Sequence, residues 1–120
     1  MSTYLDGLRR SRRNAYRAKP EVKARREAYR QKPQVKAAAR RCHLVSQYAI
    51  TPEEYDRLFI KQFGRCAICD SLPGVRRLGV DHDHNTGVVR GLLCNRCNTG
   101  LGYFSDNPLS LRNAARYLQP

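Results

Sequence analysis

The spacing of apolar and polar residues changes along the chain, and each spacing predicts a different kind of element. Residues 1–50 hold few large apolar residues and many Ala, Arg, Lys, Glu and Gln, which favour helix. Residues 52–63 place apolar residues three and four apart, as in a helix with one buried face. Residues 78–93 contain two short apolar runs around an Asn-Thr-Gly turn signal, which indicates a hairpin.

The start of the helix after residue 50 is clearly signalled. Thr51 is a suitable N-cap, Pro52 a first helical residue, and Glu54 completes a capping box. Gly64 supplies a stop. The residues expected on its buried face are Tyr55, Leu58, Phe59 and Phe63.

The remaining elements follow from similar signals. A strand over 78–80 enters Asp81, residues 88–93 form the returning strand, and NRCNTGLGYF continues as a short helix carrying Asn98. The last helix should begin near Asn107-Pro108. Its expected inward face is Leu111, Ala114, Ala115 and Leu118. The predicted fold class is therefore α+β.

The first 50 residues contain an internal repeat. Residues 15–27 read AYRAKPEVKARRE, and residues 28–40 read AYRQKPQVKAAAR. Pro20 and Pro33 fit as first helical residues, so we expect two or three short helices with bends. The large apolar residues of the repeat are too few for a core of their own: Tyr16, Val22, Tyr29 and Val35.

Charge divides the chain in the same place. Residues 1–50 hold 14 Arg and Lys against 3 acids, a net of +11, whereas residues 51–120 hold 9 against 7, a net of +2. We therefore predict a basic helical arm over 1–50 and a separate domain over 51–120. The arm is expected to bind a polyanion, with DNA the leading candidate, although a solvated arm that only aids solubility is the alternative.

A membrane partner is disfavoured, because no apolar run approaches the roughly 18 residues of a spanning helix. Apolar residues are also sparse in the arm. We expect a cytoplasmic protein. The residues expected to contact the DNA backbone are Arg12, Arg13, Arg17, Lys23, Arg25, Arg26, Arg30 and Lys36 in the arm, with Arg90 and Arg96 in the domain.

Two Cys-x-x-Cys pairs are the clearest chemical signal. Cys66 with Cys69, and Cys94 with Cys97, have the form of two zinc knuckles. Four thiolates complete a tetrahedral zinc site and leave no position for substrate, so the zinc is expected to be structural. A redox role is the alternative, and the lack of a βαβ pattern disfavours it.

Between the knuckles, acids and imidazoles alternate at Asp81, His82, Asp83 and His84. An imidazole is a competent general base near neutral pH. Carboxylates are ligands for hard cations. The alternatives are surface polar groups or additional zinc ligands. Cys42 and His43 stay unassigned.

Residues 66–118, CAICD…LGVDHDHNTGVVRGLLCNRCNTGLGYFSDNP…AARYL, resemble the recombination endonuclease VII family, part of the wider HNH or ββα-metal nucleases. The resemblance implies a small zinc-stabilised ββα-metal domain that cuts DNA. It implies that His82 is the general base and that Asp81 and Asn98 hold Mg²⁺ or Mn²⁺. It places His84 near the scissile phosphate and leaves Asp83 without a role.

The chain departs from that family at one point. The family has an acid on the helix shortly after the Asn, whereas residues 99–102 read TGLG. Junction resolution therefore does not follow from the motif. A non-catalytic, zinc-finger-like DNA-binding protein is the main alternative, and an RNA nuclease or RNA-binding protein is a third. The location implied is a bacterial or phage-infected cytoplasm, and the protein would be a monomer or homodimer.

Overall fold

The computed structural model describes residues 2–119, and the side chains of residues 4–119. Internal contacts divide the chain into two compact units, with the division between Cys42 and His43. The division lies ahead of the boundary expected at residue 50, because the last turns of the third helix pack with the second unit. The architecture is mixed, with six helices and one two-stranded sheet among the described residues.

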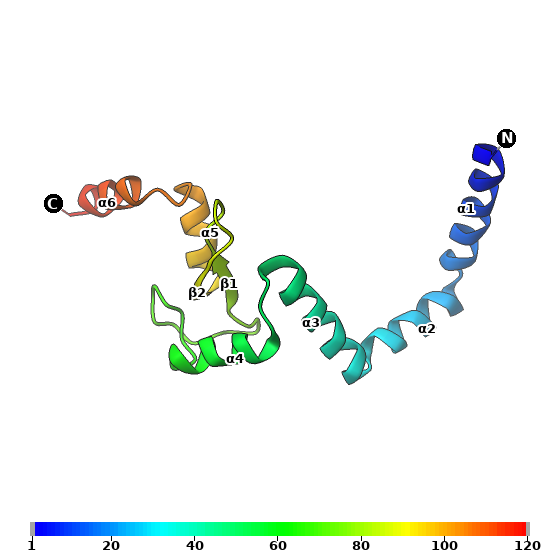
Figure 1. Ribbon diagram of the computed structural model, residues 1–120, viewed down its shortest axis with the longest axis horizontal. Coiled ribbons are helices and arrows are strands. Elements are labelled where there is room, and N and C mark those ends of the chain that lie inside the picture. The colour runs from blue at the N-terminus through cyan, green and yellow to red at the C-terminus, as the bar shows by residue number, and fades with distance from the viewer. Residues whose placement is uncertain (1, 120) are drawn as a thin grey trace. The chain divides into compact units, whose positions relative to one another are not determined.

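Three helices make up the basic arm (Figure 1): α1 (Ser2–Ala18), α2 (Pro20–Gln31) and α3 (Pro33–Tyr48). Lys19 and Lys32 separate them in extended conformations, with ψ of 135° and 133°. A residue that precedes proline is disfavoured in the helical region, so each Lys-Pro pair interrupts the helix. The predicted short helices with bends are thus confirmed.

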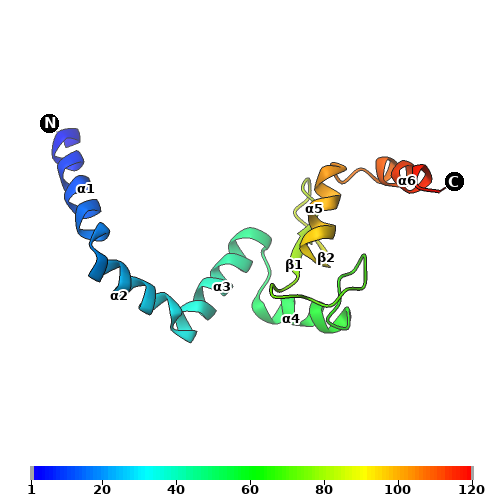
Figure 2. The same ribbon diagram turned by 180° about the vertical axis from the view of Figure 1, so that it is seen from behind.

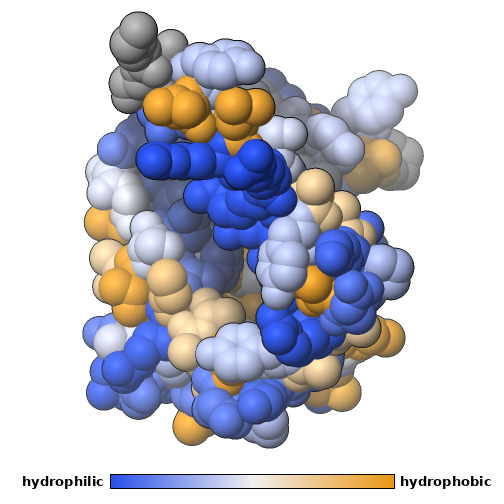
Figure 3. Space-filling view, turned by 90° about the vertical axis from the view of Figure 1, so that its right-hand side faces the viewer, coloured by the Kyte–Doolittle hydropathy of each residue, from blue (hydrophilic) through white to orange (hydrophobic). Residues whose placement is uncertain are grey.

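The arm buries little of its own surface. Val22 is buried, but Tyr16 and Tyr29 leave 51% and 59% of their surface exposed. On the face drawn in Figure 3, apolar residues are scattered among hydrophilic ones. Among the described residues, no helix is long and apolar enough to span a membrane.

The second unit begins its own elements with α4 (Pro52–Lys61), and the predicted capping box is present. The Thr51 hydroxyl accepts a hydrogen bond from the Glu54 backbone N–H at 3.2 Å, and the Glu54 carboxylate accepts one from the Thr51 N–H at 2.7 Å. Gly64, with φ of +69°, closes the end by donating to the Phe59 carbonyl at 2.8 Å.

The predicted burial is wrong at Phe63 and in the last helix. Phe63 lies beyond the end of α4 with φ of +54° and is 87% exposed. The last helix, α6 (Pro108–Tyr117), begins at the expected place, with Asn107 as its N-cap, but none of its residues is buried and Leu118 is 81% exposed. The reason is the preceding turn, which leads α6 away from the sheet (Figure 1).

The sheet is an antiparallel hairpin of β1 (Gly79–His82) and β2 (Val89–Leu93), followed by α5 (Asn95–Tyr103). Figures 1 and 2 both show α5 beside this hairpin. The order strand, turn, strand, helix matches the prediction. The core packs between α4, the hairpin and the end of α3, and its buried members are Leu44, Tyr55, Cys66, Leu78, Val80, Leu92 and Leu93.

Gln62 anchors the outer edge of β2. Its side-chain oxygen accepts from the Leu92 N–H at 2.8 Å, and its nitrogen donates to the Leu92 carbonyl at 2.9 Å. One amide therefore satisfies both backbone groups that a third strand would pair. Gly91 permits this approach, because a Cβ there would lie 3.1 Å from the Gln62 oxygen.

Candidate active site and metal centre

The four knuckle cysteines converge as predicted. The sulfurs of Cys66, Cys69, Cys94 and Cys97 all lie within 4.8 Å of one another. The Cys69 and Cys94 sulfurs are 3.7 Å apart. A tetrahedron with Zn–S bonds of about 2.3 Å has edges of about 3.8 Å. The four sulfurs are therefore spaced to hold one zinc ion.

Backbone hydrogen bonds within a tight turn form the first knuckle. The Cys66 N–H donates to the Ser71 carbonyl at 2.9 Å, and the Asp70 N–H donates to the Cys66 carbonyl at 3.0 Å. The Ser71 hydroxyl, 3.0 Å from the Cys69 sulfur, lowers the pKa of Cys69 to about 6, while burial raises the pKa of Cys97 to about 12. A bound zinc ion would hold all four as thiolates.

A β-bulge shapes the site next to this cluster. Asp81 pairs with Gly91 and His82 pairs with Val89, so Arg90 is an extra residue on β2. A bulge turns a side chain away from the regular alternation of a strand. Arg90 consequently reaches Asp81 with both arms of its guanidinium: Nε donates to Oδ2 at 2.7 Å and Nη2 to Oδ1 at 2.8 Å. The carboxylate of Asp81 is buried, and this guanidinium balances its charge.

Asp106 extends the pair into a network. Its Oδ2 accepts from Arg90 Nη2 at 3.1 Å and lies 3.6 Å from His84 Nε2. The hydrogen bonds that Arg90 donates, chiefly those to Asp81 and then the one to Asp106, raise the pKa of Arg90 further above its already high value. Asp106 follows Ser105 in the turn between α5 and α6, and both have φ of +52°. Positive φ is unfavourable for residues other than glycine, and in this turn it directs the Asp106 carboxylate towards Arg90 and His84.

Asp83, which the sequence left without a role, holds the hairpin turn. Its Oδ1 accepts from the N–H groups of Asn85 and Thr86, both at 2.8 Å. These bonds lower the pKa of Asp83, the Thr86 bond most. Asp83 is thus a turn-forming residue that fixes the connection between the two strands.

His82 lies in a row of aromatic rings. Its ring centroid is 5.4 Å from that of Tyr48 and 4.7 Å from that of His84, and His43 packs edge-on against Tyr48 at 5.8 Å. Tyr48 and His43 come from the end of α3, which the sequence had placed in the arm. Their contribution was missed because nothing in the local pattern links α3 to a strand so distant along the chain.

Asn98 reaches the same strand from α5. A Cβ on Gly79 would lie 3.7 Å from the Asn98 side-chain nitrogen. Gly79 and Asp81 are two residues apart, so they point to one face of β1. The structure thereby brings Asp81, His82, His84 and Asn98 to one hairpin and its helix. The carboxylate and carboxamide are oxygen donors of the kind that hard cations prefer.

Residues 41–120 match the family model of recombination endonuclease VII. The chain belongs to this family. It is 49% identical over 78 residues to the Gene 59 protein of Mycobacterium phage D29, and 46% identical over 77 residues to the Gene 59 protein of Mycobacterium phage L5. These matches cover 63% and 62% of this chain, and 47% of each relative, so the chain spans about half the length of these curated relatives. No solved structure matches the chain.

The match to recombination endonuclease VII begins at residue 41, close to the start of the second compact unit. It contains the four cysteines, the Asp-His-Asp-His strand and Asn98, and it leaves most of the arm outside. The family match therefore applies to the domain and not to the repeats.

Arg90 and Arg96, both expected to contact DNA, have different surroundings in this endonuclease VII domain. Arg90 is tied to Asp81 and Asp106 within the site, whereas Arg96 is exposed on α5. The basic residues expected to bind DNA from the arm are all exposed on its three helices: Arg12, Arg13, Arg17, Lys23, Arg25, Arg26, Arg30 and Lys36.

Proposed function

We propose that this chain is a metal-dependent endonuclease of the HNH, or ββα-metal, type that hydrolyses phosphodiester bonds of DNA. The observation that carries the proposal is the grouping of a buried carboxylate, an imidazole and a carboxamide at one hairpin: Asp81, His82 and Asn98. Binding alone does not require that combination, whereas phosphodiester hydrolysis uses a general base and hard-ion ligands.

Asp81 and Asn98 would hold Mg²⁺ or Mn²⁺, for which their oxygens are suitable ligands. Such an ion, when bound, stabilises the charge that develops on the phosphate and on the leaving 3′ oxygen. Each carboxylate oxygen offers more than one acceptor position, so Asp81 can serve an ion while keeping a hydrogen bond to Arg90. Arg90 then keeps the carboxylate oriented.

His82 would remove a proton from the attacking water. The water oxygen forms a bond to phosphorus, the bond from phosphorus to the 3′ oxygen breaks, and the proton of the water passes to the imidazole. The leaving 3′ oxygen takes a proton from solvent water. The products are a 5′ phosphate and a 3′ hydroxyl. The rings of Tyr48 and His84 both contact the His82 ring and would limit its rotation.

His84 and Arg90 line the cleft next to Asp81 and would donate hydrogen bonds to the scissile phosphate. Asp106 also lines this cleft and contacts both side chains. We assign it as a positioning residue, which orients His84 and limits the movement of Arg90. It would take the place of the acid that is absent from residues 99–102.

The zinc would be structural. Its ligands join the loop before β1 to the end of β2 and the first turn of α5, where Cys94 is the N-cap. A bound ion would therefore fix α5, and with it Asn98, against the hairpin. The core of the domain is small, so this cross-link adds stability that packing alone does not supply.

One observation favours a second candidate, a non-catalytic DNA-binding protein. Both oxygens of Asp81 are engaged by Arg90, as in a purely structural ion pair. In that case the hairpin would need neither a divalent ion nor a general base.

Cleavage by purified protein separates the two candidates. We expect Mg²⁺ or Mn²⁺ to support nicking or cutting of DNA, and EDTA to stop it. A panel of plasmid, linear duplex, single strand, four-way junction and RNA would define the preferred substrate. Binding of these DNAs with no cleavage under either ion would establish the non-catalytic candidate instead.

The arm would bind the phosphate backbone of DNA through its exposed basic side chains. Replacing Arg25 and Arg26 together with Gln should reduce the slope of log affinity against log salt by about 0.9 for each phosphate that the variant no longer neutralises. Fluorescence anisotropy at several salt concentrations measures this slope. A matched variant with Gln at Arg112 and Arg116 of α6 controls for total charge, and equal slopes in the two variants would remove the arm from DNA binding.

A further inference from the structure

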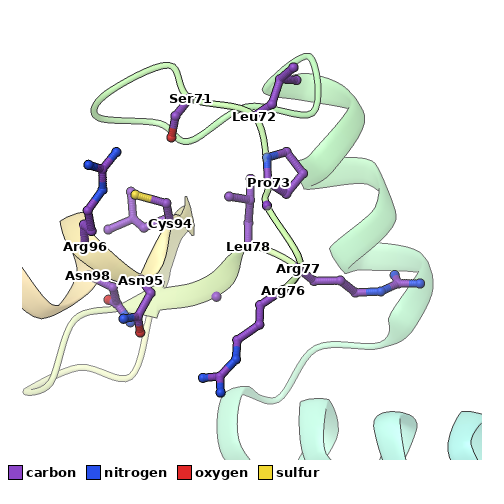
Figure 4. A pocket seen from close by; sticks show the side chains of 13 residues that line it. Ser71, Leu72, Pro73, Arg76, Arg77, Leu78, Cys94, Asn95, Arg96 and Asn98 are labelled. Carbon is purple, nitrogen blue, oxygen red and sulfur yellow. The ribbon is translucent and has the colours of Figure 1, made fainter.

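A groove adjoins the proposed hydrolytic residues and meets them at Asn98 on α5. It is a cavity of about 430 Å³ between the loop over residues 71–79 and the first turns of α5 (Figure 4). Asn98 belongs to both the groove and the candidate active site. The residues that line the groove include Ser71, Pro73, Arg76, Asn95, Arg96 and Asn98.

The groove is strongly cationic. Three arginines line it, namely Arg76, Arg77 and Arg96, and no acid is among its lining residues. In Figure 4, Arg76 and Arg96 extend on opposite sides of Asn95 and Asn98, whereas Arg77 points away from the cavity. The charge of two guanidinium groups is therefore presented to whatever enters beside Asn98.

The chemistry of the lining indicates which part of a nucleic acid fits. Guanidinium groups bind phosphate through paired N–H donors, and asparagine amides add neutral donors. No aromatic ring is among the lining residues, so stacking on bases is not available there. This set of groups is therefore suited to contacts with the phosphate backbone.

A different explanation of the arginines is local charge balance. Zinc bound by four thiolates carries a net charge of −2, and a nearby cation would offset it. Arg96 is suited to that role, because it lies towards Cys94 in Figure 4, between the two cysteines of its knuckle in sequence. Arg76 lies on the far side of the groove from Cys94, so charge balance does not account for it.

We propose that this groove binds the sugar–phosphate backbone of a DNA strand, with Arg76 and Arg96 holding phosphates on either side of Asn98. The proposal rests on the proposed function and deepens it, because it gives the domain its own contact with substrate, separate from the arm. The strand in the groove leads directly to the proposed ligand pair, Asn98 and Asp81.

The test compares Arg76→Gln with Arg77→Gln in the full chain. These neighbours have the same side chain, but the side chain of Arg76 extends beside Asn95 and Asn98, whereas that of Arg77 points away from the cavity. We expect Arg76→Gln to weaken duplex binding about tenfold without added Mg²⁺ or Mn²⁺ and to lower the salt slope by about 1. Arg77→Gln should remain within about twofold of the parent. Arg76→Lys should fall between them, since it keeps the charge but loses the paired donors.

Cleavage and zinc content complete the test. In Mg²⁺, Arg76→Gln should lose about tenfold in kcat/KM, mostly through KM, and it should retain its zinc. Equal binding and cleavage by Arg76→Gln and Arg77→Gln would overturn the groove assignment. A parent that binds DNA but does not cut it would remove the proposed function, while a binding difference between the two variants would still support the groove.

Discussion

Replacement of His82 by Ala should reduce the rate of DNA cleavage by about 100-fold or more, with folding, zinc content and DNA binding retained. The imidazole is the only proposed proton acceptor for the attacking water. Its side chain is half-buried between Tyr48 and His84, so its removal leaves a partly solvated space rather than a closed cavity. Single-turnover cleavage measures the chemical step directly.

His43→Ala is the matched control for this experiment. His43 belongs to the same row of rings but contacts Tyr48 rather than the strand that carries Asp81. We expect it to cut within about threefold of the parent, because it touches no reacting group. Both variants and the parent should contain one zinc ion per chain. A His82→Ala protein that cuts at the parent rate would show that the base is a different residue.

Replacement of Arg90 by Gln should destabilise the zinc-loaded domain by about 2 kcal/mol when no Mg²⁺ or Mn²⁺ is present. The change leaves the buried Asp81 carboxylate without its guanidinium, and solvent limits the effect because the Arg90 side chain is 37% exposed. Thermal unfolding of the zinc-loaded protein without added Mg²⁺ or Mn²⁺ should therefore show a melting temperature lower by about 10 °C for a domain of this size.

The effect of Mg²⁺ on the melting temperature tests whether Asp81 is a ligand. If Asp81 is a ligand, Mg²⁺ should raise the melting temperature of Arg90→Gln more than that of the parent, because the ion no longer shares the carboxylate with a guanidinium. The double variant with Asp81→Asn should lose that response. Asp106→Asn serves as a milder control, since Asn tolerates the positive φ. It changes the contacts of residue 106 with Arg90 and His84 but keeps the pair of Arg90 with Asp81. Equal Mg²⁺ responses in Arg90→Gln and the double variant would contradict ligation by Asp81.

Local sequence was sufficient for most of the elements. Caps at Thr51 and Asn107, and the Lys-Pro interruptions of the arm, depend on neighbouring residues alone, and all were predicted. The cysteine cluster could also be predicted from the sequence. Two Cys-x-x-Cys pairs form one four-cysteine site as soon as the chain folds back once. The burial of Phe63 and Leu118 was mispredicted, because helical spacing shows which residues share a face but not whether another element covers it.

The partners of the candidate active-site residues depended on the fold. A bulge of one residue on β2 turns Arg90 onto Asp81, and a left-handed turn after α5 brings Asp106 to Arg90 and His84. Tyr48 reaches His82 from a helix that the charge pattern assigned to the arm. Composition and spacing identified the cysteines and the alternating Asp and His residues as capable of chemistry, because that capacity belongs to each side chain, and the resemblance to the endonuclease VII family added Asn98. Their contacts were set by register, bulge and packing, because those place residues together that are far apart along the chain.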